Sequence, residues 1–189
     1  MRIAVFYATR EGQTAKIARH IVHELQTSQV QVDIHDVKDL EGSVDWSPYD
    51  AAVVAASVHI GRHEPEMIKF ARQHRAELER LSAMLLSVSL SEAGAEDPEA
   101  SDERRAKAAA DVQMMIDTFV KDTGWHPDHI LPVAGALAYS RYNFIIRFVM
   151  KRIARANGAP TDTSRDYELT DWAKLDRFVR RRLLLRLAS

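Results

Sequence analysis

Met1-Arg-Ile-Ala-Val-Phe-Tyr-Ala-Thr-Arg-Glu-Gly-Gln-Thr14 carries the clearest structural signal in the sequence. Residues 2–8 are a nearly uncharged run of branched and aromatic side chains, typical of a strand buried on both faces of a parallel sheet. Two threonines then flank Gly12, and from Ile17 onward apolar residues recur at helical spacing. A strand, a turn and a helix start predict an anion site, because the first N–H groups of a helix lack partners and lie at the positive end of its dipole.

The turn itself has the chemistry of a phosphate site. Its residues, Thr9-Arg10-Glu11-Gly12-Gln13-Thr14, resemble the phosphate loop of flavodoxins, in which Thr/Ser-x-x-Gly-x-Thr surrounds the terminal phosphate of FMN. Hydroxyl groups suit a phosphomonoester because they donate hydrogen bonds and require no metal. The lysine-containing P-loop pattern and the G-x-G-x-x-G fingerprint are both absent from the sequence. Taken alone, the turn leaves open an ordinary strand–helix connection with a threonine N-cap.

Composition bounds the remaining possibilities. The 189 residues are expected to form a single domain, and 26 basic against 27 acidic residues argue against wholesale nucleic-acid binding. The absence of cysteine excludes disulfides, thiol catalysis and iron–sulfur ligation, and no metal site is expected. With no apolar run long enough to span a membrane and no room for a signal peptide, the sequence predicts a cytoplasmic protein. A homo-oligomer stays an open alternative.

Strands and helices are expected to alternate along the chain. Residues 30–37 alternate apolar and polar like an edge strand, residues 50–57 and 83–90 resemble doubly buried strands, and residues 129–137 contain a further strand. Helices are expected after Pro65, over residues 101–120 with Ser101 as N-cap, and from Thr170 to about Leu187. The acidic residues 91–102 are expected to form a solvated loop. This pattern predicts an α/β fold, a flavodoxin-like, doubly wound, five-stranded parallel sheet of order 2-1-3-4-5.

In that topology, ligands bind at the carboxyl ends of the strands where the strand order reverses. Three loops meet there, and each follows a buried strand with small or hydroxyl-bearing residues. The predicted FMN-binding residues are therefore Thr9, Arg10, Glu11, Gly12, Gln13, Thr14, Ser57, Val58, His59, Ile60, Gly61, Ser87, Val88, Ser89 and Leu90. None of the ring loops offers the aromatic side chain with which flavodoxins usually cover the flavin, so one face of the ring is expected to be open.

An insertion of about residues 138–168 follows the last strand, and a plain flavodoxin does not have it. It lacks acids as far as Thr161, and Arg147, Lys151 and Arg155 recur every four residues, which predicts a basic amphipathic helix. Three interpretations stay open: a helix packed on the domain, a surface element that touches anionic lipid, or a lid whose cations hold substrate carboxylates.

Over nearly its full length the chain resembles the bacterial flavodoxin-like, quinone-dependent protoporphyrinogen IX dehydrogenases. The resemblance rests on residues 9–14, Ala56-Ser57 with Gly61, and residues 87–90, 125–128, 134–137, 139–142, 161–163 and 170–172. The segment Gly135-Ala136-Leu137 with Arg141-Tyr142, followed by a basic insertion, is the most specific of them.

The resemblance implies FMN-dependent oxidation of protoporphyrinogen IX to protoporphyrin IX in haem biosynthesis. Menaquinone or ubiquinone would accept the electrons, and the enzyme would bind peripherally to an anionic membrane surface at the inner face of the cell membrane. Arg141, Arg147 and Lys151 are the candidates for binding the substrate propionates, and Tyr139 and Tyr142 for stacking on a ring. No catalytic base is identified, and His59 and His63 are expected to be solvated loop histidines.

Two other functional classes compete with this hypothesis. A flavodoxin-type FMN electron carrier that serves a protein redox partner would be strongly acidic, whereas the net charge here is −1. A phosphate-binding α/β module without flavin would give a colourless protein that does not bind added FMN.

Overall fold

A computed structural model describes residues 1–40, 42–156 and 158–184 of the chain. Its elements in chain order are β1 (Arg2–Ala8), α1 (Gln13–Gln26), β2 (Gln31–Asp36), β3 (Ala51–His59), β4 (Arg62–His63), α2 (Pro65–Gln73), α3 (Arg75–Arg80), β5 (Ser82–Ser89), α4 (Leu90–Ala95), α5 (Asp102–Thr123), β6 (His129–Ala134), β7 (Ala136–Leu137), the 3-10 helix η1 (Tyr139–Arg141), α6 (Phe144–Ala156), β8 (Tyr167–Glu168), α7 (Trp172–Val179) and the π-helix η2 (Arg180–Leu184).

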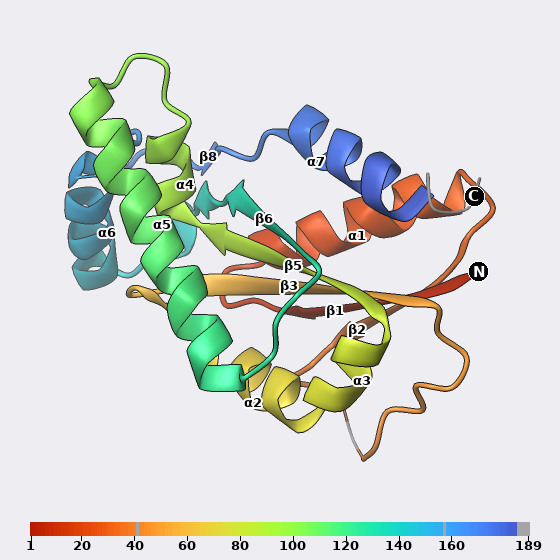
Figure 1. Ribbon diagram of the computed structural model, residues 1–189. Coiled ribbons are helices and arrows are strands. Elements are labelled where there is room, and N and C mark those ends of the chain that lie inside the picture. The colour runs from red at the N-terminus through yellow and green to blue at the C-terminus, as the bar shows by residue number, and fades with distance from the viewer. Residues whose placement is uncertain (41, 157, 185–189) are drawn as a thin grey trace.

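The main sheet confirms the predicted topology. Its long strands run in the order β2-β1-β3-β5-β6, every pair of neighbours is parallel, and the short β4 folds back antiparallel on the end of β3. The helices α1 and α7 cover one face of this sheet, and α2, α3 and α5 cover the other (Figure 1). Both faces of the central strands are therefore buried, which explains why their sequences are almost uninterrupted apolar runs.

The last predicted strand divides at Gly135. β6 ends at Ala134, and β7 leaves the main sheet to pair antiparallel with β8, so that Leu137 lies opposite Tyr167. The N–H of Gly135 still donates to the carbonyl of Ser89 at 3.0 Å, which holds the turn against the end of β5. Residues 138–166, which include α6, thus leave and re-enter the fold at one two-stranded ribbon, at the carboxyl-terminal end of the sheet (Figure 1).

The expectation that residues 91–102 form only a solvated loop is wrong. α4 begins directly after β5, and the Ser89 hydroxyl caps it by accepting from the N–H of Glu92 at 3.2 Å. Glu92 is buried, and the ammonium of Lys174 in α7 lies 2.9 Å from its carboxylate and 2.5 Å from that of Glu96. These acidic residues therefore help to hold α4 against α7, because Lys174 neutralises Glu92 and Glu96.

Two helix boundaries also differ from the sequence prediction. Asp171, rather than Thr170, caps the closing helix by accepting from the N–H of Lys174 at 2.9 Å, while the Thr170 hydroxyl donates to the carbonyl of Ala134. The expected end near Leu187 lies outside the described residues. The helix that begins at Pro65 is interrupted at His74, which separates α2 from α3. For α5, the predicted cap is confirmed, because the Ser101 hydroxyl accepts from the N–H of Arg104.

Candidate functional site

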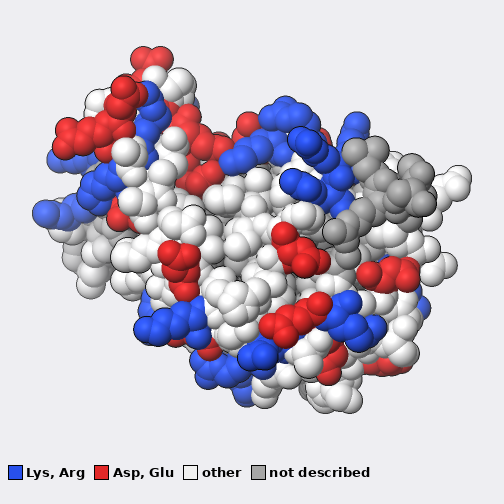
Figure 2. Space-filling model, in the orientation of Figure 1, with Lys and Arg blue, Asp and Glu red and all other residues white. Residues whose placement is uncertain are grey.

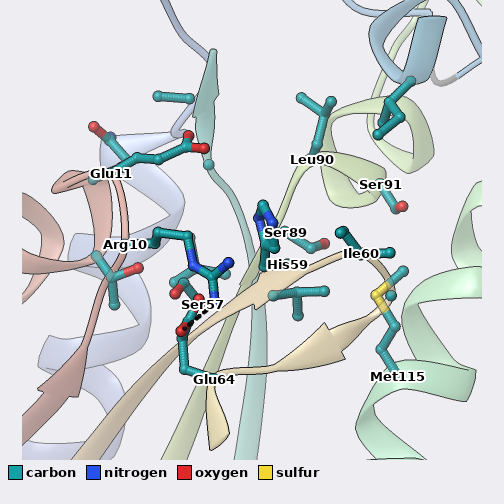
Figure 3. A pocket seen from close by; sticks show the side chains of 18 of the residues that line it. Arg10, Glu11, Ser57, His59, Ile60, Glu64, Ser89, Leu90, Ser91 and Met115 are labelled. Carbon is teal, nitrogen blue, oxygen red and sulfur yellow. Dashed lines mark hydrogen bonds and ion pairs between the residues drawn. The ribbon is translucent and has the colours of Figure 1, made fainter. Parts of the chain in front are cut away.

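A cavity of about 410 Å³ opens at the carboxyl ends of β1, β3 and β5, where the strand order reverses. Its wall comes from the turn after β1, the hairpin between β3 and β4, the start of α4, the middle of α5, the turn at Gly135 and the inner side of α6 (Figure 3). The position is the one that open α/β sheets use for ligands, because loops from adjacent strands diverge there and leave a crevice.

The turn after β1 has the geometry of an anion cradle. Gly12 has a φ of 96°, in the left-handed region where a glycine avoids the strain of a side chain, and its N–H donates to the Thr9 hydroxyl at 3.0 Å. α1 begins at Gln13 and has no acid in its first turn. Thr14 is buried and lines the cavity. A phosphate placed here would meet the free N–H groups and the positive dipole end of α1.

A buried acid lies beneath this turn. Glu64, 2% exposed, precedes α2, and the guanidinium of Arg10 reaches its carboxylate at 3.1 Å (Figure 3). Its other carboxylate oxygen has no hydrogen-bond partner among the described residues, and neither does the hydroxyl of Ser57. Both residues line the cavity. Buried polar atoms normally have partners, so a ligand with hydroxyl donors, such as the polyol of a flavin, fits this part of the cavity.

The hairpin between β3 and β4 forms the opposite rim. Ile60 and Gly61 at its tip have φ values of 49° and 75°, and the Ile60 side chain is 82% exposed. A branched residue rarely adopts a positive φ, so this tip is strained. No Phe, Tyr or Trp is among the described residues that line the cavity; its apolar wall consists of aliphatic and thioether side chains, with Leu90, Met114, Met115, Met150 and Ile153 as members. The expected open ring face agrees with this lining.

A family model described as a flavodoxin domain matches residues 4–164. The chain belongs to the flavodoxin family. A curated relative, "Protoporphyrinogen IX dehydrogenase [quinone]" from Escherichia coli (strain K12), is 31% identical over 180 residues, which cover 95% of this chain and 93% of the relative. A protein of the same name from Leishmania major is 29% identical, over 93% of this chain and 71% of that protein.

Among solved structures, that of an NADH:FMN oxidoreductase in its apo form covers 97% of this chain and 89% of its own, with a TM-score of 0.53 and 12% sequence identity. This likeness extends to the fold alone. Membership of the flavodoxin family implies a flavin cofactor. The cradle, the unpartnered Ser57 and Glu64 oxygens and the crevice with its aliphatic and thioether lining all fit such a group.

Most of the predicted flavin-binding residues meet at the cavity. Those that line it are Thr9, Arg10, Glu11, Gln13, Thr14, Ser57, Val58, His59, Ile60, Gly61, Val88, Ser89 and Leu90. Gly12 shapes the cradle without lining the cavity. Ser87 is turned away: it is buried, and its hydroxyl lies 2.9 Å from Nε2 of His63 on the far side of the strand. Its predicted contact with the cofactor does not fit this geometry, because successive side chains of a strand point to opposite faces.

The cavity lining also contains residues that are not among those predicted to bind the flavin. They are Glu64, Ser91, Asp111, Met114, Met115, Gly135, Ala136, Met150 and Ile153. Of these, the sequence indicates only Gly135 and Ala136 as candidate cavity residues. They are small residues at the end of a buried strand, as Ser57 is. Met114 and Met115 lie in the middle of α5, where the sequence does not distinguish a methionine that lines a cavity from one that packs in the core.

The predicted substrate residues lie outside the cavity lining. Tyr139 is 0% exposed and donates to the carbonyl of Pro160 at 2.9 Å, and Tyr142 is buried with its hydroxyl 2.5 Å from a carboxylate oxygen of Glu11. Neither ring is available for stacking, so that expectation needs correction. Arg141 lies over the cradle, with Nη1 2.6 Å from the carbonyl oxygen of Glu11. Arg147 and Lys151 are half-buried in α6.

The two loop histidines have different surroundings. His59 is half-buried at the cavity wall. His63 is buried between Ser87 and the ring of Phe119, 4.8 Å away, and burial lowers its pKa to about 4. The expectation of a solvated histidine is therefore wrong for His63, which is neutral and belongs to the core beneath the hairpin.

α6 presents apolar side chains to solvent. Its exposed large hydrophobic residues are Phe144, Ile145, Ile146, Phe148 and Val149. The buried side of the helix is formed by Ala154, with Met150 packed against the same cluster. The amphipathic pattern is confirmed, but its widest apolar face does not pack on the domain, which contradicts the interpretation of α6 as a plain packing helix.

Proposed function

We propose that this member of the flavodoxin family is an oxidoreductase that converts protoporphyrinogen IX to protoporphyrin IX, with FMN as cofactor and a membrane quinone, menaquinone or ubiquinone, as electron acceptor. The observation that carries the proposal is the 31% identity, over 95% of the chain, to a relative named protoporphyrinogen IX dehydrogenase [quinone]. The cavity lining supports the proposal, because it has no aromatic side chain among the described residues to cover the flavin ring. A tetrapyrrole needs such an uncovered face of the flavin to lie against.

The cradle favours FMN over a flavin that lacks phosphate. The turn of residues 9–14 offers a left-handed glycine, a threonine hydroxyl and the start of a 14-residue helix, which together suit a phosphate dianion. Ser57 and Glu64 would accept hydrogen bonds from the polyol between phosphate and ring. When bound, the flavin supplies the centre that accepts hydride from the porphyrinogen and passes electrons to the quinone.

The chain's own part in the reaction is to position the substrate and exclude water. The apolar wall of Leu90, Met115 and Met150 would contact the macrocycle edge and shield it from solvent. Arg147 and Lys151 would bind propionates at the rim, since α6 passes the cavity through Met150 and Ile153 and presents cations on neighbouring positions.

We also propose that α6 binds the membrane surface from which the quinone is drawn. Its exposed phenylalanines and branched residues lie among Arg147, Lys151, Arg152 and Arg155, which is the composition of a helix lying at a lipid interface. No helix in the described part of the chain combines the length and apolarity needed to cross a bilayer. On the face shown in Figure 2 acids and bases are interspersed, unlike the acidic surface of a carrier that steers towards basic partners.

Anaerobic turnover tests the proposed reaction. Purified protein loaded with FMN, protoporphyrinogen IX and a soluble quinone should produce porphyrin fluorescence faster than the same mixture without protein. Fluorescence that grows no faster than in the protein-free control would rule the reaction out. A protein that is colourless and does not bind added FMN would exclude the cofactor as well.

A further inference from the structure

Two cationic side chains donate hydrogen bonds to backbone carbonyls of the phosphate turn, residues 9–14, and neither side chain lines the cavity. The ammonium of Lys38, just after β2, donates to the carbonyl of Thr9 at 2.7 Å. The guanidinium of Arg141, in the insertion and 130 residues from its partner, donates to the carbonyl of Glu11 at 2.6 Å. Both bonds hold peptide oxygens of the turn on its outer side.

The orientation of these oxygens fixes the orientation of the N–H groups. In a trans peptide the C=O and the N–H point in opposite directions, so an outward carbonyl of Glu11 turns the N–H of Gly12 inward. The observed bond from that N–H to the Thr9 hydroxyl, inside the turn, agrees with this orientation. Gly12 has the freedom to rotate this peptide, since its φ of 96° is open to a residue without a side chain. The hydrogen bond from Arg141 therefore favours the peptide orientation in which the Gly12 N–H points into the turn, where an anion would bind.

Arg141 also lies close to the glycine of the turn. Its Nη1 is 3.0 Å from the point where a Cβ of Gly12 would stand, so the guanidinium covers the glycine. The cations nearest in sequence are already engaged: Arg10 pairs with Glu64 at 3.1 Å, and Lys16 with Glu168 at 2.7 Å. Within residues 1–40, 42–156 and 158–184, no carboxylate forms an ion pair with Arg141; Asp166, bonded to Ser140, interacts with it only at longer range.

The neighbouring Tyr142 binds the carboxylate of Glu11, the acid of the turn. Its hydroxyl donates to the carboxylate of Glu11 at 2.5 Å, on the insertion side. Burial raises the pKa of Tyr142, and the hydrogen bond to Glu11 adds to that rise, so the phenol keeps its proton and stays a donor. At its other end the insertion meets the same turn, where Gln13 donates to Glu168 and to Thr170, each at 2.9 Å.

We propose that Arg141 is a positioning residue of the phosphate site: by holding the carbonyl of Glu11 on the outer side of the turn, it orients the Glu11–Gly12 peptide so that its N–H faces the phosphate of the bound flavin. Through Arg141 the insertion thereby contributes to the cofactor site. This role replaces the binding of a substrate propionate, which the sequence led us to expect for Arg141. The inference rests on the proposed FMN site.

The test compares flavins with and without phosphate. Dissociation constants for FMN and for riboflavin are measured by quenching of flavin fluorescence, in phosphate-free buffer, for the wild type and for R141A, R141K and R152A. Arg152 is an exposed arginine of the same insertion and provides the matched control. We expect R141A to weaken FMN binding at least about tenfold, as loss of a charge-assisted hydrogen bond predicts, with riboflavin binding almost unchanged. R141K should lie between R141A and the wild type, and R152A should match the wild type.

The outcomes separate this inference from the proposed function. Wild-type protein that binds FMN, with R141A binding it equally well, overturns the role of Arg141 and leaves the FMN site intact. Equal weakening of FMN and riboflavin by R141A also overturns it, because the effect would then not come from the phosphate. Wild-type protein that binds neither flavin overturns both.

Discussion

Replacing His63 with Gln should remove the part of the pH dependence of the free energy of unfolding that arises from the burial of this histidine. His63 is buried at the junction of the hairpin and β5, with Ser87 and Phe119 as neighbours. Burial lowers its pKa from 6.5 to about 4. The unfolded chain therefore takes up a proton on His63 as the pH falls below about 6.5, while the folded chain remains neutral there until about 4.

The magnitude follows from the separation of these two pKa values. Each pH unit between them costs the folded state about 1.4 kcal/mol, so the wild type should lose about 3 kcal/mol from this group between neutral pH and pH 4. A glutamine at position 63 keeps a polar partner for the Ser87 hydroxyl and does not titrate. The H63Q variant should thus be less stable than the wild type at neutral pH by a small amount, and the two should converge or cross as the solution becomes acidic.

Urea unfolding at several pH values measures this directly. Because both proteins share every other titrating group, the difference between their free energies of unfolding isolates His63. Exchange of the exposed His126 for Gln is the control for loss of a histidine as such. A wild-type-minus-variant difference that stays constant from neutral pH to pH 4 would refute the reasoning.

Substitutions at three further places in the fold should change stability or membrane binding. Lys174→Met leaves the buried Glu92 without its cation, and should cost about 2 kcal/mol in urea unfolding, part of which Glu92→Gln restores in the double variant; full stability of the single variant would contradict this. Ile60→Gly should raise the free energy of unfolding by about 1 kcal/mol, since glycine relieves the positive φ at the exposed tip; a loss of stability would show that the strain is absent. Exchanging Phe144 and Phe148 for Ser should abolish sedimentation with anionic vesicles without changing FMN binding, and unchanged sedimentation would exclude α6 as the membrane contact.

The parts of the fold that could be predicted are those that local sequence determines. The doubly buried strands have continuous apolar sequences, and the phosphate turn has its hydroxyls and glycine within six residues, so both were readable without tertiary information. The strand order followed from the alternation of strands and helices and from the handedness of crossovers. All three were confirmed, the turn in its geometry.

What could not be predicted depends on partners far away in the chain. The buried state of Glu92 depends on Lys174, and the cation that pairs with Glu64 in the cavity wall is Arg10, 54 residues away. A single acid before a proline looks like an ordinary surface residue until that contact is known. Periodicity likewise identified the apolar side of α6 but could not tell whether protein or solvent faces it, since both arrangements need the same pattern.

The short ribbon of β7 and β8 makes the insertion a separable module. Because Leu137 and Tyr167 lie opposite each other, residues 138–166 begin and end at nearly one point, and a tight hairpin could replace them without moving any strand of the main sheet. The exchange of this segment between relatives is accordingly a practical route for transplanting substrate preference, provided that the recipient's phosphate turn accepts the incoming arginine.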